Sequence, residues 1–334
     1  MASTVNNDAS PTVYRPIERH EYQQAFDLWY TVFKTAPPGF FERYLASEAS
    51  PRYQINDTLG AWHDGKLVSA VHIRRLIFRL KDDNQEYLCA AISNVATLPE
   101  YRMRGYSRNL LRLALHKMEN GAEFDMSCLD TPRHNHYSVL GWEQVTVPCP
   151  VNIHWEDLNH DSHNIEWWPA SDVLLSDGQL LLKIYSNNPR AYQFDRAPLA
   201  MFQHWTGFYW RNDEAIICVL DDDEQGYVVI KKPNHQADVC ISEWRAANID
   251  VEKKLLKLAA IEIRRRHPQT KVIRLQGVPQ YISLDGLRDW AGAVDVERNP
   301  NTMFRNLRLP EETFQDVKAA FYSGKAIWWL GDYF

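Results

Sequence analysis

A basic turn around Gly105 is the stretch of the sequence whose residue types most plainly suggest chemistry. Arg102, Arg104 and Arg108 surround this glycine in a chain whose formal net charge is −6. The turn precedes a helix predicted over Tyr106–Glu119, so the unpaired N–H groups of the helix start converge there. These N–H groups, the helix dipole and the arginines favour a bound phosphate, and the glycine lets its backbone approach closely. The alternative is a solvated basic helix start without a ligand.

The segments around this turn predict the elements that hold it in place. Strands are predicted at 12–17, around 60–80, at 87–98 and at 124–130, and helices over His20–Lys34 and Tyr106–Glu119. Asp64 and Gly65 suit a type I′ turn inside an antiparallel meander. Pro37, Pro38 and Gly39 end the first helix, and a further helix is predicted after them. The basic turn therefore joins a strand to a helix that ends at Gly121.

Two motifs resemble a known family. The run Arg102-Met103-Arg104-Gly105-Tyr106-Ser107 resembles the R/Q-x-x-G-x-G/A pyrophosphate loop of GNAT-type N-acetyltransferases, with serine at the last position instead of glycine or alanine. Downstream, "HNHYSVLGWEQV" resembles the family's aromatic-Tyr-x-x-x-Gly-Phe element, with Tyr137, Gly141 and Trp142 at its key positions. The resemblance covers roughly Val13 to Val147.

The resemblance implies an acetyl-CoA-dependent N-acetyltransferase that works by direct attack of an amine, with acetyl-CoA as co-substrate and without a metal. Tyr137 matches the family's general acid, which protonates the departing thiolate. The pyrophosphate would bind the basic loop, and the pantetheine arm would pair with a strand. The cofactor-binding residues implied in this way are Val95, Ala96, Thr97, Arg102, Met103, Arg104, Gly105, Tyr106, Ser107, Arg108, Pro132 and Arg133.

A second unit of the same kind follows in "NIDVEKKLLKLAAIEIRRRHPQTKVIRLQGVP". Leu255-Leu256 repeat Leu110-Leu111 at an offset of 145 residues (255 − 110), and strands are predicted on both sides of each helix. At this offset Asp250 stands where Gly105 does, and no basic glycine loop precedes the helix. Asp250 is expected to cap the helix with its carboxylate and to fill the anion site. We interpret this unit as a degenerate copy without CoA.

The predicted fold class is α/β: two tandem GNAT-like domains, with mixed, mostly antiparallel central sheets flanked by helices, and a short C-terminal helix-strand extension. The tandem layout resembles the enhanced-intracellular-survival (Eis) type of N-acetyltransferase, which ends in a small sterol-carrier-like domain. Only the start and end of that domain resemble this chain, so sterol binding is not expected. The predicted division is a disordered tail at 1–12, a catalytic domain at 13–150, a degenerate domain at 151–300 and a truncated sterol-carrier-like extension at 301–334.

The last residue, Phe334, carries an α-carboxylate. In the multi-domain acetyltransferases that the chain resembles, the terminal carboxylate enters the active site and helps to take the proton from the attacking amine. The ending "AIWWLGDYF" is suited to such a path, because Ile327–Leu330 predict an apolar strand and Gly331 permits a bend. The alternative is a terminal strand that only pairs with the sheet.

Composition excludes several other classes of protein. With 45% hydrophobic and 24% charged residues and a slightly acidic balance, the chain has no general attraction to nucleic acid or to a membrane. The five cysteines form no CxxC pair, and the polar start "MASTVNNDASPT" lacks an export signal, so a cytoplasmic location is expected. His134 and His136 have no acidic or thiol partner nearby in sequence, so no metal site is expected.

The expected partner is a small-molecule or peptide amine, and Phe40 and Phe41 are predicted to line its cleft. The alternative from a different class is a catalytically silent acyl-CoA-binding or protein-interaction module, which needs the basic loop but not Tyr137. The sequence leaves open the identity of the amine, the general base, the use of a longer acyl-CoA and the oligomeric state, with a homo-oligomer as one alternative.

Overall fold

The computed structural model describes residues 11–81, 85–121, 123–155, 166–220, 225–232 and 239–332. The first half contains β1 (Val13–Pro16), α1 (Tyr22–Val32), β2 (Thr58–His63), β3 (Lys66–Leu80), β4 (Glu86–Thr97), α2 (Tyr106–Asn120), β5 (Met126–Asp130), α3 (His134–Ser138) and β6 (Glu143–Trp155). The rest contains β7 (Trp168–Pro169), α4 (Ala170–Ser176), α5 (Gly178–Asn187), β8 (Tyr192–Phe194), α6 (Leu199–Asn212), β9 (Ile216–Leu220), β10 (Gly226–Lys231), β11 (Cys240–Ala246), α7 (Ile249–Arg266), β12 (Ile273–Leu275), α8 (Leu284–Ala291), β13 (Gly292–Asn306) and α9 (Glu311–Ser323).

The first half has the predicted meander and crossover. Strands β2, β3 and β4 pair antiparallel, and the β2–β3 turn has positive φ at both Asp64 (51°) and Gly65 (74°), as a type I′ turn requires. Helix α2 then leads to β5, which runs parallel to β4. The helix predicted after Gly39 is wrong in type, because only a short 3-10 turn forms at Glu42–Tyr44.

The second half repeats this order of elements. Strands β9, β10 and β11 form an antiparallel meander, and α7 leads from β11 to β12, which runs parallel to β11. The parallel pairs Cys89–Met126 and Cys240–Arg274 lie at corresponding points of the two halves. The repeat inferred from the leucine pairs is therefore present in three dimensions.

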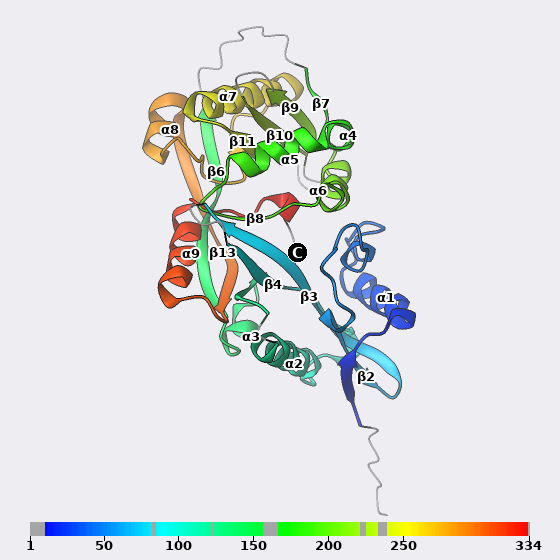
Figure 1. Ribbon diagram of the computed structural model, residues 1–334. Helices are drawn as coiled ribbons and strands as arrows, with labels where there is room; N and C mark the ends of the chain where they lie inside the picture. Colours follow the sequence, from blue (N-terminus) through cyan, green and yellow to red (C-terminus); the bar gives the residue numbers. More distant parts are fainter. Residues whose placement is uncertain are drawn as a thin grey trace, which may run out of the picture.

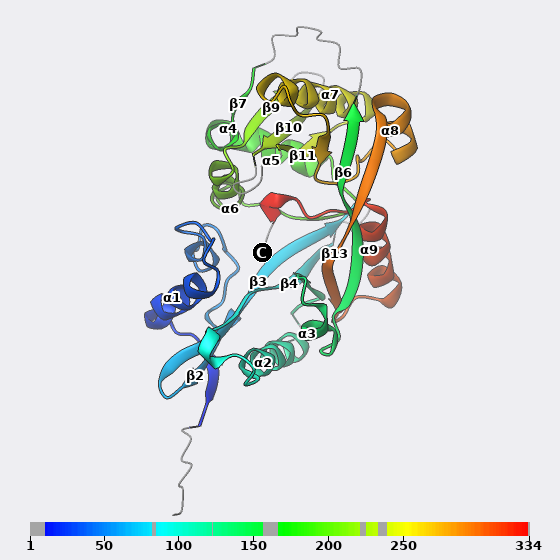
Figure 2. The same cartoon turned by 180° about the vertical axis from the view of Figure 1, so that it is seen from behind.

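The two halves share one sheet. The 13 strands follow the order β1-β2-β3-β4-β5-β13-β6-β12-β11-β10-β9-β7, with β8 paired to β3. Strands β6 and β13 run side by side through both lobes (Figures 1 and 2). In the first lobe β13 pairs with β5, and in the second lobe β6 pairs with β12. The boundaries expected at 150 and 300 fall inside these two strands, and the division into domains stays a prediction.

Helices α1 and α2 cover opposite faces of the first meander. The buried face of α2 is the predicted one, with Leu110, Leu111, Ala114, Leu115 and Met118. On β3, Val71 and Ile73 pack in the same cluster as α2, whereas Ala70 packs in the cluster under α1. Neighbouring residues of a strand point to opposite faces, so the alternation separates the two helices.

The C-terminal extension has the predicted helix, α9, but not the predicted strand. Residues 327–329 have no regular structure, and Leu330–Asp332 form a 3-10 turn. Tertiary contacts hold this segment: Trp328 stacks on Phe194 with ring centroids 4.4 Å apart, and Trp329 meets Trp244 at 5.0 Å. Trp328 packs against the cluster that includes Leu76 and Phe78 of β3, and Trp329 packs in the cluster of the second meander, so the two rings face different halves and the backbone turns instead of joining the sheet.

Residues 1–10 of the predicted tail lie outside the described residues. Among the helices that the structure describes, none has both the length and the apolar character needed to cross a membrane.

Candidate active site

The basic turn has the geometry of an open anion site at a helix start. Gly105 is the N-cap residue of α2 with φ 82°, a left-handed conformation that favours glycine, and no side chain caps the helix. A Cβ atom at Gly105 would meet nothing within 4 Å. Met103 also has positive φ (64°) and is fully exposed. The first amides of α2 therefore face open space, where an anion can reach them.

The arginines give this turn positive charge and also form hydrogen bonds that hold its backbone. The side chain of Arg102 donates to the carbonyl of Thr97 at 3.2 Å, and that of Arg104 donates to the carbonyl of Glu100 at 3.1 Å. The side chains of both residues, and that of Arg108 in the first helical turn, are exposed. The turn thus presents positive charge on a backbone held by its own guanidinium groups.

Strands β4 and β5 separate next to this turn. They pair only through Cys89–Ala91 and Met126–Cys128, whereas β4 continues to Thr97. In the part of the chain that the structure describes, no strand pairs with the β5-facing edge of β4 beyond Ala91. Val95, Ala96 and Thr97 belong to this unpaired stretch, as an amide-rich ligand arm would require.

Tyr137 belongs to α3, the short helix that follows β5. The residue is 8% exposed and belongs to the same hydrophobic cluster as Tyr106 of α2 and Val95 of β4. Trp142 meets its ring edge-on at 6.1 Å. Burial raises the pKa of Tyr137 to about 12, and the positive charge of Arg133 opposes this shift. The hydroxyl is therefore protonated at neutral pH, as an acid must be.

His136 connects α3 to the basic turn. Its Nε2 lies 3.4 Å from the hydroxyl of Ser107, and its pKa is lowered by burial and by the charges of Arg108 and Arg133. Arg133 therefore lies close enough to add its charge to the loop, whereas Pro132 is an exposed neighbour. The described residues contain no group of three or more His, Cys, Asp or Glu side chains that could hold a metal ion.

Phe40 and Phe41 have different surroundings. Phe41 is 1% exposed and packs on Trp29 with ring centroids 5.5 Å apart, so it is a core residue and not the cleft residue predicted. Phe40 is half-buried and meets Phe208 and Tyr209 of α6, each at 6.2 Å. Helix α1 therefore covers Phe41, whereas helix α6 of the second half lies against Phe40.

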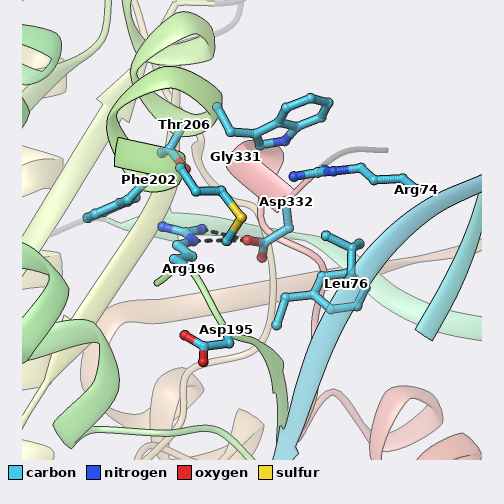
Figure 3. A pocket seen from close by; sticks show the side chains of 11 residues that line it. Arg74, Leu76, Asp195, Arg196, Phe202, Thr206, Gly331 and Asp332 are labelled. Atoms are coloured by element: carbon cyan, nitrogen blue, oxygen red, sulfur yellow. Dashed lines mark hydrogen bonds and ion pairs between the residues drawn. The ribbon is translucent and has the colours of Figure 1, made fainter. Parts of the chain in front are cut away.

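A small cavity, partly open to solvent, lies where the two halves meet (Figure 3). It lies on the face of β3 opposite α2, and its lining includes Arg74, Leu76, Phe202, Trp205, Gly331 and Asp332. Arg196 donates to Glu243 at 2.7 and 3.0 Å and to Asp332 at 2.9 Å. These bonds pin the last described turn beside the cavity. Phe334, predicted to be catalytic, lies outside the described residues.

The hydrogen bond between Trp29 and Asn94 was not predicted from the sequence. The indole N–H of Trp29 donates to the carbonyl oxygen of Asn94 at 2.8 Å, at a point of β4 where φ is positive (51°). An asparagine inside a strand-like run is unusual, and this was the one local signal available. The pairing of the two residues depends on how α1 packs on the sheet.

The start of α7, by contrast, is already occupied by the protein's own oxygens. Asn248, and not Asp250 as predicted, caps the helix, because its side-chain oxygen accepts from the N–H groups of Asp250 and Val251 at 3.0 Å. Glu252, at the position of Ser107 by the offset of 145, is fully buried. Its carboxylate accepts from Trp244 Nε1 and from the backbone N–H groups of Gln280, Tyr281 and Ile282. An anion at the start of α7 would have to compete with the Asn248 oxygen for the amides of Asp250 and Val251, and it would lie near the carboxylate of Glu252.

Replacing Glu252 with Ala should lower the free energy of unfolding by about 3 kcal/mol or more, because four buried or partly buried donors lose their acceptor. Urea unfolding followed by tryptophan fluorescence measures this change. Exposed Glu312 on α9 provides a matched control, and its replacement with Ala should change stability by less than about 0.5 kcal/mol. Equal stability of the two variants would contradict the role given to the Glu252 carboxylate.

Comparison with known proteins gives a family match for the first part of the chain and a fold for both halves. A family model described as an acetyltransferase (GNAT) domain matches residues 13–145. A probable N-acyltransferase from Enterococcus faecalis is 18% identical, with a TM-score of 0.65 over 89% of this chain and 73% of that chain. Eis1 from Mycobacterium abscessus is 17% identical, with a TM-score of 0.64 over 89% and 74% of the two chains.

A GCN5-related N-acetyltransferase from Anabaena variabilis is 15% identical, with a TM-score of 0.63 over 89% of this chain and 73% of that chain. Similarity at these identities concerns the fold. It extends over both halves and confirms the predicted fold class. No curated protein sequence matches the chain.

Proposed function

We propose that the protein is an N-acetyltransferase that transfers the acetyl group of acetyl-CoA to an amine, because residues 13–145 match a family model described as an acetyltransferase (GNAT) domain. The observation that carries the proposal is the uncapped start of α2 at Gly105, which lies next to the unpaired edge of β4. The pyrophosphate would bind the amides of residues 103–108 and the charges of Arg102, Arg104 and Arg108. The pantetheine arm would pair with Val95–Thr97. We propose one such site per chain, because in the second half the side-chain oxygen of Asn248 already accepts from the amides of Asp250 and Val251 at the start of α7.

Tyr137 is the proposed general acid. Transfer leaves a CoA thiolate, which a protonated phenol at the end of the opening can neutralise. The amine would approach from the face of the sheet opposite α2, where the cavity beside Asp332 lies. The proposed partner is therefore a small-molecule or peptide amine that enters between the halves. The proposed location of the protein is the cytoplasm.

The test is release of the CoA thiol from acetyl-CoA in the presence of a panel of amines. Release that depends on one class of amine, with the acetylated amine detected by mass spectrometry, would support the enzyme. Binding of acetyl-CoA without transfer to any amine would favour the catalytically silent acyl-CoA-binding module instead. The same screen with longer acyl-CoA thioesters defines the acyl group.

The α-carboxylate of Phe334 is the proposed base. Adding a few glycines after Phe334 should lower turnover by about a hundredfold, because the carboxylate is displaced while the core is untouched. Thiol release measures the loss, and thermal unfolding and acetyl-CoA affinity should stay near those of the parent chain. Full activity in the extended variant would assign the proton to water or to another side chain.

A further inference from the structure

Asn94 lies in a bulge of β4 that the protein holds in place. The β3–β4 register shifts between the pairs Ala70–Ala96 and His72–Ser93, and Asn94 takes a positive φ of 51° there. Asparagine is among the few non-glycine residues that adopt this conformation readily. The fully buried Trp29 fixes it by donating its indole N–H to the Asn94 carbonyl at 2.8 Å. The bulge is therefore a defined feature, placed where β4 has left β5.

The side-chain amide of Asn94 contains a hydrogen-bond donor without a partner among the described residues. Its Nδ2 atom is buried, and within the described part of the chain it has no hydrogen-bond acceptor. Buried amide groups in native proteins are nearly always bonded, because burial removes the hydrogen bonds that water would make. An acceptor that arrives with a ligand would satisfy this group.

The neighbouring residues indicate which ligand atom this is. Val95–Thr97 follow Asn94 directly and form the edge that we assign to the pantetheine arm, whose last group is the acyl thioester. The thioester carbonyl oxygen is an acceptor, and it becomes negatively charged during transfer. We propose that Asn94 Nδ2 donates a hydrogen bond to this oxygen and stabilises the oxyanion, a role that rests on the function proposed above.

The reaction then balances as follows. The amine nitrogen attacks the carbonyl carbon, a C–N bond forms, and the C=O electron pair moves onto the oxygen beside Asn94. The pair returns as the C–S bond breaks, and the thiolate takes a proton from Tyr137. The nitrogen loses its proton to a carboxylate or to water. Asn94 donates a hydrogen bond throughout and transfers no proton.

The cleanest test is Asn94→Gly, because glycine keeps the positive φ and removes only the side chain. We expect kcat to fall by about a hundred- to a thousandfold, the loss typical of one oxyanion donor, with KM for acetyl-CoA within a few-fold of the parent value. Asn94→Asp keeps the shape and replaces the donor with an acceptor, so its kcat should fall at least as far. Circular dichroism and the midpoint of thermal unfolding establish that both variants are folded.

Binding provides a readout that a purely structural role would not change. S-ethyl-CoA is a thioether that lacks the carbonyl oxygen. By calorimetry the parent protein should bind acetyl-CoA about fivefold more tightly than S-ethyl-CoA, which corresponds to one ordinary hydrogen bond. This difference should disappear in Asn94→Gly.

Glu214→Gly is the matched control. Glu214 is exposed, has a similar positive φ of 48° and lies between α6 and β9, so this change should leave kcat unaltered. Parent-like kcat and parent-like discrimination in folded Asn94→Gly would overturn the assignment of the donor. Absence of any acetyl transfer by the parent protein would overturn the function proposed above and this role with it.

Discussion

Replacing Arg104 with Glu and Gly105 with Val should abolish detectable acetyl-CoA binding. A carboxylate at 104 repels the pyrophosphate that the guanidinium attracts. At 105 the backbone has φ 82°, which a β-branched residue adopts only with strain, so the first amides of α2 would turn away from the ligand. Isothermal calorimetry measures the loss, which we expect to exceed a hundredfold.

Two single variants separate this effect from general damage. Gly65 has a similar φ of 74° and equally open surroundings in the β2–β3 turn, so Gly65→Val imposes the same strain elsewhere. Arg112→Glu reverses a charge on the exposed face of α2 one turn beyond the loop. Both should bind acetyl-CoA nearly as the parent does. Unchanged affinity in the loop variant would defeat the assignment of this turn to CoA.

Replacing Tyr137 with Phe should lower turnover by about two to four orders of magnitude. Phenylalanine keeps the ring packed against Trp142 and removes only the proton donor, so acetyl-CoA affinity should stay near normal. The matched control is Tyr14→Phe, since Tyr14 packs against the same cluster and its hydroxyl bonds to Asn109. Parent-like turnover of Tyr137→Phe would move the acid to another group.

The pH dependence of turnover tests the same assignment. A phenol acts as an acid only below its pKa, and burial raises the pKa of Tyr137 to about 12. Its proton is therefore present throughout the neutral and mildly alkaline range, and turnover should not fall between about pH 7 and pH 10 because of this group. A fall within that range that persists in Tyr137→Phe would report a different titrating group.

The sequence by itself determined the local units of this protein. The Arg102–Ser107 run, the apolar face of α2 and the Asp64-Gly65 turn depend on residues that are neighbours along the chain. The 3.6-residue period of a helix, the two-residue period of a strand and the residue types of a turn can all be recognised in the sequence itself. The leucine pairs at 110 and 255 indicated the repeat for the same reason, because each copy builds its own helix and meander.

Some residues could be assigned to an element but not to their surroundings. Phe41 is an aromatic residue in a segment predicted to line the cleft, yet it lies in the core because α1 packs over it. The apolar run Ile327–Leu330 has strand-like residues, yet it ends in a 3-10 turn because Trp328 and Trp329 pack in two different buried clusters. In both places contacts with distant residues outweigh a weak local preference.

Only the tertiary structure decided how the two copies are joined and what surrounds the chemistry. Strands β6 and β13 each serve both lobes, and hydrogen bonds between residues as distant as Met126 and Asn306 form this arrangement. The bulge at Asn94 depends likewise on Trp29, a residue of another element. Strand pairing and burial follow from surfaces that meet only in the folded chain. The spacing of residues along one sequence does not show which of these surfaces will meet.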